Sequence, residues 1–123
     1  MAELLIVDDE TDVREFAANF FRKRKIDVIT AGSGEEALLF IEKEKPKLVL
    51  LDITMPGIDG IETLRRIRKL NEKLNVVMVT GIYPDEGDAF KQCQELGVKV
   101  YIHKPLRLEE LQEVVLREMA LCA

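Results

Sequence analysis

Five short runs of leucine and β-branched residues recur along the chain, and each is followed by a stretch with helical spacing. The runs are expected to be strands, and they cover Leu4–Val7, Val28–Thr30, Leu48–Leu51, Val76–Val79 and Val100–Ile102. Three of the five are continuous apolar runs rather than alternating ones. Continuous runs are typical of parallel strands that are covered by helices on both faces of a sheet.

Apolar residues between these runs repeat at intervals of three and four, which is the spacing of an amphipathic helix. The clearest repeats are Val13, Phe16, Ala17, Phe20 and Phe21, then Ile61, Leu64 and Ile67, and finally Leu108, Leu111, Val115 and Met119. Weaker helices are expected after Gly34, with Ala37, Leu38 and Ile41, and over Glu86–Leu96, where Gly97 would end the helix. We therefore predict an α/β fold in which right-handed crossovers connect a five-stranded parallel sheet flanked by five helices.

Residues 1–123 are expected to form one domain, because this length leaves no room for a second core of comparable size. Hydrophobic residues make up 47% of the chain and charged residues 33%, which is the balance of a globular domain rather than of a disordered tail. The sequence has no secretion signal and no run of eighteen apolar residues. We expect a cytoplasmic protein that does not enter a membrane.

The net charge of −5 disfavours nucleic-acid binding, because binding a phosphate backbone depends largely on basic contacts. The basic runs Arg22–Lys25 and Arg65–Lys69 are interpreted as exposed helix ends or faces, with partner docking as the alternative. Cys93 and Cys122 have no partner at ligand spacing, so we expect neither a zinc site nor a disulfide framework.

Polar residues follow four of the five predicted strands. They are Asp8, Asp9 and Glu10 after the first, Asp52 after the third, Thr80 and Gly81 after the fourth, and Lys104 and Pro105 after the fifth. In a parallel α/β sheet the binding crevice lies beyond the carboxyl ends of the strands, at the point where the strand order reverses. We therefore expect carboxylates, a hydroxyl and an ammonium group to meet at one edge of the sheet.

Carboxylates that lie close together repel one another and favour the binding of a cation. Oxygen ligands with room for water suit Mg²⁺. With the cation bound, a carboxylate oxygen of Asp52 could attack a phosphoryl donor, while Lys104 neutralises charge and the hydroxyl of Thr80 senses the product. Taken singly, each aspartate could instead cap a helix or form a turn, Thr80 could be a turn residue, and Lys104 could be a surface lysine. His103 is interpreted as a partly exposed edge residue rather than a ligand.

Four segments carry a resemblance to a known family. They are Leu5–Glu10, Leu51–Gly60, Val79–Gly81 and Tyr101–Pro105. With these segments the chain resembles the receiver domain of two-component response regulators, and it is similar to the single-domain regulators of chemotaxis. The block Asp52–Gly60 is the most specific of the four. The resemblance implies a flavodoxin-like fold of five βα units with the strand order 2-1-3-4-5.

The resemblance also implies a role for each site residue. Asp52 would be the phosphoacceptor, and Mg²⁺ would be bound directly by Asp9, Asp52 and the main-chain carbonyl of Thr54, with Asp8 acting mainly through water. Thr80 would move toward the phosphoryl group and Tyr101 would swing inward behind it, while Gly81 leaves space for that movement. The peptide between Lys104 and Pro105 is expected to be cis, which would aim the lysine inward. Tyr101 could equally be a core aromatic with its hydroxyl at the surface.

The implied partners are a histidine kinase or phosphotransfer protein as donor, and a downstream protein that binds at the fourth helix, the last strand and the fifth helix. The protein would be a monomer or a phosphorylation-dependent dimer. The chain ends at Ala123 without an output domain, so it would be a stand-alone regulator or an excised receiver. Pro84 could restrict the loop before the fourth helix.

Three other functions fit the sequence less well. A phosphatase or phosphotransferase of the haloacid dehalogenase kind would need an aspartate at position 54, which is Thr54. A flavodoxin-like cofactor carrier would need a loop that binds phosphate where Asp8 and Asp9 stand. A pseudo-receiver, which acts only as a docking module, would lack part of the site, whereas no member of the site is missing from this sequence. We expect a phosphoacceptor switch rather than an enzyme, with slow self-dephosphorylation because neither Thr54 nor Ile82 is suited to orient a water.

Overall fold

Five strands and five helices alternate along the chain in this computed structural model, which describes residues 3–53, 58–81 and 89–121. The strands are β1 (Leu4–Val7), β2 (Val28–Ala31), β3 (Leu48–Asp52), β4 (Asn75–Thr80) and β5 (Val100–His103). The helices are α1 (Thr11–Arg22), α2 (Gly34–Glu44), α3 (Gly60–Leu70), α4 (Ala89–Glu95) and α5 (Leu108–Leu121). All five predicted strands are confirmed. The last four extend slightly beyond their predicted runs, because the pairing continues into Ala31 in β2 and into polar residues in β3, β4 and β5.

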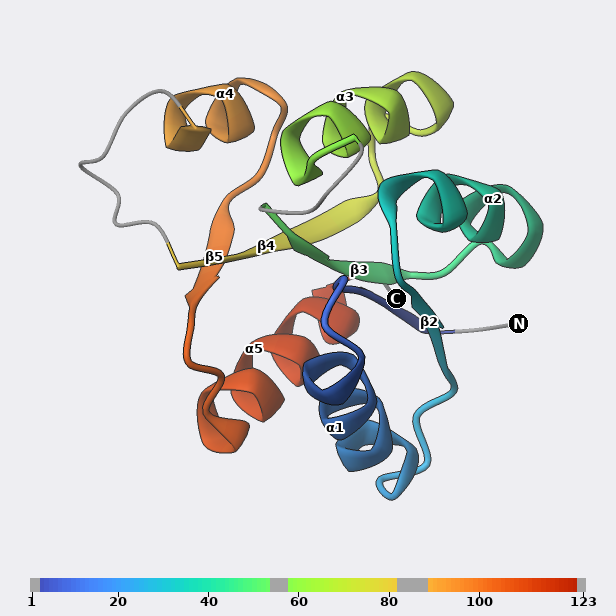
Figure 1. The fold of residues 1–123 in the computed structure, drawn as a ribbon, viewed down its shortest axis with the longest axis vertical. Coiled ribbons are helices and arrows are strands. Elements are labelled where there is room, and N and C mark those ends of the chain that lie inside the picture. Colours follow the sequence, from blue (N-terminus) through green and yellow to red (C-terminus); the bar gives the residue numbers. More distant parts are fainter. Residues whose placement is uncertain (1–2, 54–57, 82–88, 122–123) are drawn as a thin grey trace.

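The five strands form one parallel sheet in the order β2-β1-β3-β4-β5, which confirms the predicted topology. Helices α1 and α5 cover one face of the sheet, and α2, α3 and α4 cover the other (Figure 1). The strand order reverses between β1 and β3, which lie side by side in the centre. The carboxyl ends of these two strands therefore lie at the switch point where such folds bind ligands.

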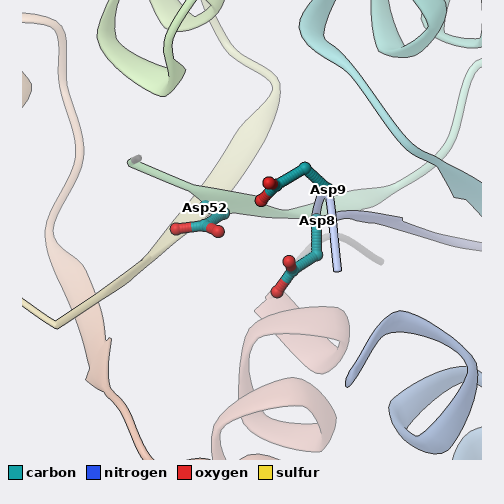
Figure 2. Close-up of side chains that lie close together, drawn as sticks. All are labelled: Asp8, Asp9 and Asp52. Atoms are coloured by element: carbon teal, nitrogen blue, oxygen red, sulfur yellow. The ribbon is translucent and has the colours of Figure 1, made fainter. Parts of the chain in front are cut away.

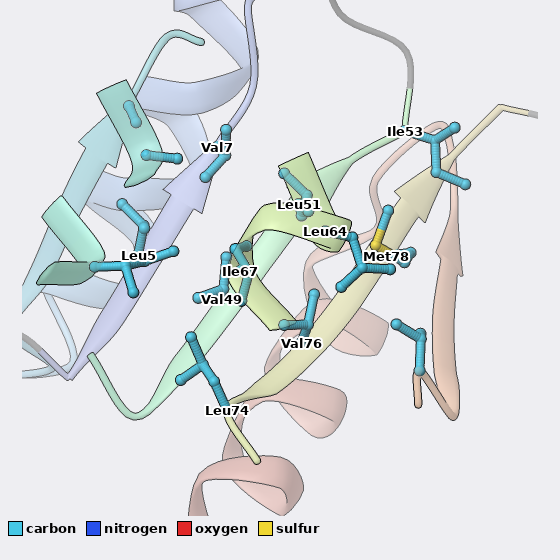
Figure 3. Close-up of a cluster of buried hydrophobic side chains, with 14 of the residues drawn as sticks. Leu5, Val7, Val49, Leu51, Ile53, Leu64, Ile67, Leu74, Val76 and Met78 are labelled. Atoms are coloured by element: carbon cyan, nitrogen blue, oxygen red, sulfur yellow. The ribbon is translucent and has the colours of Figure 1, made fainter. Parts of the chain in front are cut away.

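The core consists of two apolar layers, one on each face of the sheet. Neighbouring residues of a strand point to opposite faces, so Leu5 and Val7 enter the layer beneath α2, α3 and α4, whereas Leu4 and Ile6 enter the layer beneath α1 and α5. Figure 3 shows the first layer. Because both faces are covered, the three central strands β1, β3 and β4 are almost entirely buried, and the site lies at their ends.

Local signals set several helix ends. The side chains of Ser33 and Asp59 accept hydrogen bonds from the main-chain nitrogens three residues later and so cap α2 and α3. Gly97 has a φ of 86°, in the left-handed region that glycine tolerates best, and it follows α4 as predicted. Among the described residues, no helix is long and apolar enough to cross a membrane.

The buried face of α1 does not include all of its phenylalanines. The buried residues of this helix are Ala17, Ala18 and Phe21, whereas Phe16 is 56% exposed. Counting back by three and four residues from these buried positions gives Arg14, which is half-buried. The helix was predicted, but its apolar spacing alone did not show that Phe16 would face solvent and that Arg14 would lie toward the sheet.

The interpretation of the basic runs as exposed helix ends or faces is right for Arg22–Lys25 and wrong for part of Arg65–Lys69. The guanidinium of Arg68 is partly buried, and burial lowers its pKa. It donates to the carbonyl oxygens of Leu96 and Leu74, with 2.6 Å for each nitrogen–oxygen distance. Arg68 therefore ties the end of α3 to the residue after α4 and to the loop before β4.

Gly60, the first residue of α3, lies directly against the backbone of β3. A Cβ atom at this position would lie 2.1 Å from the carbonyl oxygen of Asp52 and 2.6 Å from the Cα of Ile53. The nitrogen of Gly60 also donates to the carbonyl of Ile53 at 2.8 Å. A side chain would have to push α3 away from the strand that carries Asp52.

We predict that Gly60→Ala lowers the free energy of unfolding by about 1–3 kcal/mol, the usual cost of overpacking, or by more, because the clash is with backbone that cannot turn aside. Gly81→Ala is the matched control, since no described atom lies within 4 Å of the Cβ position there. Urea denaturation of both variants gives the comparison. Equal stability of the two would show that α3 can move away from β3 at no cost.

Candidate functional site

Three aspartates meet at the carboxyl ends of the two central strands. Asp8 and Asp9 follow β1, and Asp52 is the last residue of β3. One carboxylate oxygen from each lies within 4.8 Å of the other two, and Figure 2 shows the three side chains gathered around the ends of these strands. Asp8 and Asp52 are only 4% and 2% exposed, whereas Asp9 is exposed. The predicted cluster is thus present, with two of its charges shielded from water.

Asp8 is fixed by hydrogen bonds from several directions. Its nitrogen donates to the carbonyl of Ala31 at 3.1 Å, and its Oδ1 accepts from the nitrogen of Glu10 at 2.9 Å. Its own carbonyl oxygen accepts from Nη1 of Arg14 at 2.8 Å. Asp8 therefore has the turn role that was the alternative for a single aspartate, but neither Asp8 nor Asp9 is the cap of α1, which is Glu10.

Lys104 places its ammonium group among the carboxylates. Its Nζ lies 3.0 Å from Oδ2 of Asp52, 3.6 Å from Oδ2 of Asp8 and 3.7 Å from Oε1 of Glu10. Burial lowers the pKa of Lys104, but the hydrogen bond and the charge of Asp52, with the charges of Asp8 and Glu10, outweigh it, so the pKa is raised. The ammonium therefore stays protonated at neutral pH, and the alternative of a solvated surface lysine is wrong.

The main chain couples Lys104 to the end of β4. Thr80 is 1% exposed, and its carbonyl oxygen accepts from the nitrogen of Lys104 at 2.8 Å. Asp52 pairs with Val79, the residue before Thr80, so the ends of β3, β4 and β5 are held in register. The peptide between Lys104 and Pro105 is cis, as the resemblance implies.

Tyr101 lies on β5 and packs against the apolar layer that contains Cys93. Burial, and next the nearby Cys93 thiol, raise the pKa of Tyr101, so its phenol stays neutral at physiological pH. His103 is partly exposed on β5, which is an edge strand, as expected. Gly81 is exposed beyond β4. Whether Tyr101 and Gly81 take part in switching stays a prediction.

Cys93 is a free thiol in the core. It is fully buried, and burial raises its pKa to about 11, with a smaller opposing effect from Arg65 and a smaller reinforcing one from Asp59. A thiol with this pKa is protonated at neutral pH and therefore a poor nucleophile or metal ligand. Its role is packing.

Some expectations fall on residues outside the described part of the chain. These are the metal ligand Thr54, the water-orienting position Ile82, Pro84 and Cys122. They stay predictions from the sequence.

The sequence interpretation missed one contact of a named residue and one further residue, Arg14. Glu10 is among the polar residues predicted at the strand ends, but its pairing with Lys104 has no local signature, since the partners come from distant segments. The bond from Arg14 to Asp8 did leave a signal. Arg14 lies three, four and seven residues before the buried Ala17, Ala18 and Phe21, so it is a cation on the apolar face of a helix.

The donor set suits a hard divalent cation. All three side chains offer carboxylate oxygens, which Mg²⁺ prefers. Oxygens on opposite sides of an octahedral Mg²⁺ lie about 4.2 Å apart, so oxygens spread over distances up to 4.8 Å allow direct contact by some groups and contact through water by another. Asp8, Asp9 and Asp52 could therefore hold Mg²⁺ together.

Comparison with known proteins gives the same picture. The family described as response regulator receiver domain matches residues 4–116. Sporulation initiation phosphotransferase F of Bacillus subtilis is 34% identical over 119 residues, which cover 97% of this chain and 94% of that protein. The alkaline phosphatase synthesis transcriptional regulatory protein PhoP of Bacillus subtilis is also 34% identical, over 98% of this chain but only 51% of its own length. The chain thus spans nearly all of one relative and about half of the other.

Solved structures agree with this. The CheY-like response regulator receiver domain protein of Methanospirillum hungatei superposes with a TM-score of 0.90 at 29% identity, over 99% of this chain and 96% of that one. The receiver domain of Francisella response regulator 1452 superposes with a TM-score of 0.87 at 26% identity, over the full length of both chains. The chain therefore belongs to the response regulator receiver domain family, which serves phosphorylation-based signalling in two-component systems.

Proposed function

We propose that this domain accepts a phosphoryl group on Asp52, in a reaction that depends on Mg²⁺, and changes conformation as a result. One observation carries the proposal. The carboxylate of Asp52 is 2% exposed, lies 3.0 Å from the ammonium of Lys104, and has the carboxylates of Asp8 and Asp9 within 4.8 Å. A nucleophile, a fixed cation and a donor set for a second cation are thus gathered in one place.

The proposed reaction is a transfer from a phosphorylated histidine of a kinase or a phosphotransfer protein. An oxygen of Asp52 attacks the phosphorus, and the bond between phosphorus and the imidazole nitrogen breaks, so the imidazole leaves with its electron pair. Lys104 stabilises the negative charge that gathers on the phosphoryl oxygens. Mg²⁺ would be held by Asp9 and Asp52, with Asp8 acting mainly through water. When bound, it would supply further positive charge to the phosphoryl oxygens.

We infer a switch rather than an enzyme that turns over small substrates. The chain has Thr54 where a phosphatase with a nucleophilic aspartate would carry its second aspartate. In the proposed reaction the only acceptor is Asp52 itself, so one phosphoryl group is taken up per domain. Loss of that group by hydrolysis would reset the switch.

A hollow beside the site is a suitable docking surface for the phosphoryl donor. It is mainly apolar and is lined by Glu10, Asp12, Val13, Phe16, Lys104, Pro105 and Leu106. Because Lys104 and Glu10 belong to both the site and the hollow, a protein seated there would border Asp52. Phe16, which is 56% exposed, provides an apolar anchor of the kind that protein interfaces favour.

We propose that output is read by a protein partner at the surface formed by α4, β5 and α5. Thr80 and Tyr101 lie on β4 and β5 beside this surface, and the main chain of Lys104 is bonded to Thr80 at 2.8 Å. The net charge of −5 argues against DNA as the partner of this domain. The cytoplasmic location and the choice between a monomer and a phosphorylation-dependent dimer stay predictions.

Asp52→Asn is expected to abolish labelling by acetyl phosphate in the presence of Mg²⁺, because an amide oxygen cannot replace the attacking carboxylate. Intact mass spectrometry of the variant measures the added phosphoryl group. Asp59→Asn is the control, since Asp59 is exposed and asparagine also caps helices well, so this variant should label normally. Labelling of the Asp52 variant equal to that of the unmodified protein would refute the proposal.

Asp9→Ala is expected to weaken Mg²⁺ binding at least about tenfold, because loss of a direct ligand should cost no less than loss of a residue that only orients one. The melting temperature without Mg²⁺ should stay the same or rise, since the change also removes repulsion among the carboxylates. Asp12→Ala removes an exposed carboxylate outside the cluster and serves as the control. An NMR titration with MgCl₂ measures the affinities, and unchanged affinity in the Asp9 variant would exclude it as a ligand.

Phe16→Ser should slow phosphotransfer from the partner kinase about tenfold or more, the effect of losing roughly 1.4 kcal/mol of interface energy, and should leave labelling by acetyl phosphate unchanged. Leu39→Ser is the matched control, because Leu39 is 58% exposed but lies on α2. The partner is first identified by testing the unmodified protein against the purified histidine kinases of its host. Equal slowing by both variants would count against the hollow as the docking surface.

A further inference from the structure

Arg14 is a cation on the side of α1 that faces the sheet. It shares this side with Ala17, Ala18 and Phe21, all of which are buried. Its Nη1 donates to the carbonyl oxygen of Asp8 at 2.8 Å, and its Nε is shielded from solvent. The side chain thus runs back along the helix to the end of β1, where the first carboxylates of the site begin.

Gly32, the residue after β2, provides the space that the guanidinium occupies. A Cβ atom at Gly32 would lie 2.9 Å from Nη1 of Arg14 and 3.7 Å from its Cζ. The nitrogen of Gly32 donates to Oε1 of Glu36 at 2.9 Å, which fixes the glycine against α2. Arg14 therefore lies between a fixed glycine on one side and the main chain of Asp8 on the other.

The contact reaches the carboxylates through the main chain. Asp8 is also held by its nitrogen, which donates to Ala31, and by its Oδ1, which accepts from the nitrogen of Glu10. Arg14 adds the third point, at the carbonyl that begins the peptide between Asp8 and Asp9. Three points fix the orientation of that peptide and hence the directions in which both side chains leave it.

We propose that Arg14 is a positioning residue, which holds the Asp8 carbonyl so that the carboxylates of Asp8 and Asp9 are arranged to bind a divalent cation. This inference rests on the proposed function, because it assigns Arg14 a role in the Mg²⁺ site. The guanidinium does not touch the cation in this role, and it acts only through the loop between β1 and α1.

The charge of Arg14 and its positioning role act on Mg²⁺ in opposite directions. A positive charge near the site repels the cation, so removing that charge alone would tighten Mg²⁺ binding. Removing the contact with Asp8 would loosen the ligands and weaken binding. The sign of the change in Mg²⁺ affinity therefore separates a positioning residue from a nearby charge. Replacing a residue that only stabilises the fold would leave the Mg²⁺ affinity unchanged.

The test is an NMR titration with MgCl₂, in which amide shifts report both the affinity and the fold. We expect Arg14→Met to bind Mg²⁺ about tenfold more weakly, which is the low end of the effect seen for residues that orient metal ligands. Arg14→Lys should recover part of the affinity, because an ammonium group can still donate to the carbonyl. Arg22→Met, which removes the same charge from the exposed end of the same helix, should bind Mg²⁺ like the unmodified protein.

Gly32→Ala provides a second route to the same answer. Its Cβ would displace the end of a flexible side chain and not backbone, so the domain should fold while the guanidinium is shifted from its place. We expect weaker Mg²⁺ binding when Arg14 is present. In the Arg14→Met background, Gly32→Ala should have no further effect.

Unchanged or tighter Mg²⁺ binding by Arg14→Met would overturn the positioning role and leave the proposed function intact. If Arg14→Met does not fold, Gly32→Ala alone decides, and unchanged affinity in that variant overturns the proposal. Absence of Mg²⁺ binding by the unmodified protein would instead overturn the proposed function, whatever the Arg14 variants do.

Discussion

The repulsion among three carboxylates at the ends of two buried strands is the constraint on which the site depends. Asp8 and Asp52 are almost fully shielded from water, and moving an ion out of water costs several kcal/mol unless a partner offsets it. Lys104 supplies one positive charge against the three aspartates, and Glu10 adds a further carboxylate 3.7 Å from its ammonium, so the cluster keeps an excess of negative charge. The pKa of Lys104 is raised although burial lowers it, because the neighbouring carboxylates favour the charged form. A divalent cation would reduce the excess.

Such a cluster can persist only on a scaffold that does not relax to relieve it. The strands beneath it are buried on both faces, so Asp52 cannot turn outward without disturbing two apolar layers. Gly60 brings α3 within contact of the Asp52 backbone, and the carbonyl of Thr80 holds the main chain of Lys104. The stability of the core thus offsets the cost of holding like charges together. The site residues lie at the ends of the strands or directly after them, where the sheet holds the main chain in place.

The fold could be predicted from the sequence because each element has a local signature. Continuous apolar runs gave the strands, spacings of three and four gave the helices, and polar residues after the runs gave Asp8, Asp9, Asp52 and Lys104. The residues that were missed or misread make contacts between distant segments. Arg68 belongs to a basic run that is predicted to be exposed, but it donates to carbonyls after α4 and before β4. Phe16 belongs to the apolar repeat and yet faces solvent. This could not be predicted, because overlapping apolar stripes on one helix cannot be separated by spacing alone. The contacts of Arg68 have no signature in neighbouring residues, whereas Arg14 left one as a cation on the apolar face of α1.

The energetics of switching place a condition on the proposed mechanism. To reverse a two-state population from about 1:99 to 99:1, phosphorylation must stabilise the active state by about 5.5 kcal/mol relative to the inactive state. Hydrogen bonds to charged groups contribute about 1.5–3 kcal/mol each, so about two to four new ones would suffice. Lys104 already pairs with Asp52 at 3.0 Å. It therefore contributes only the difference between its interaction energies in the active and the inactive state. The remainder must come from contacts that Asp52 does not make before phosphorylation. Thr80, next to the residue that pairs with Asp52 across the sheet, is the side chain we infer to supply one of them.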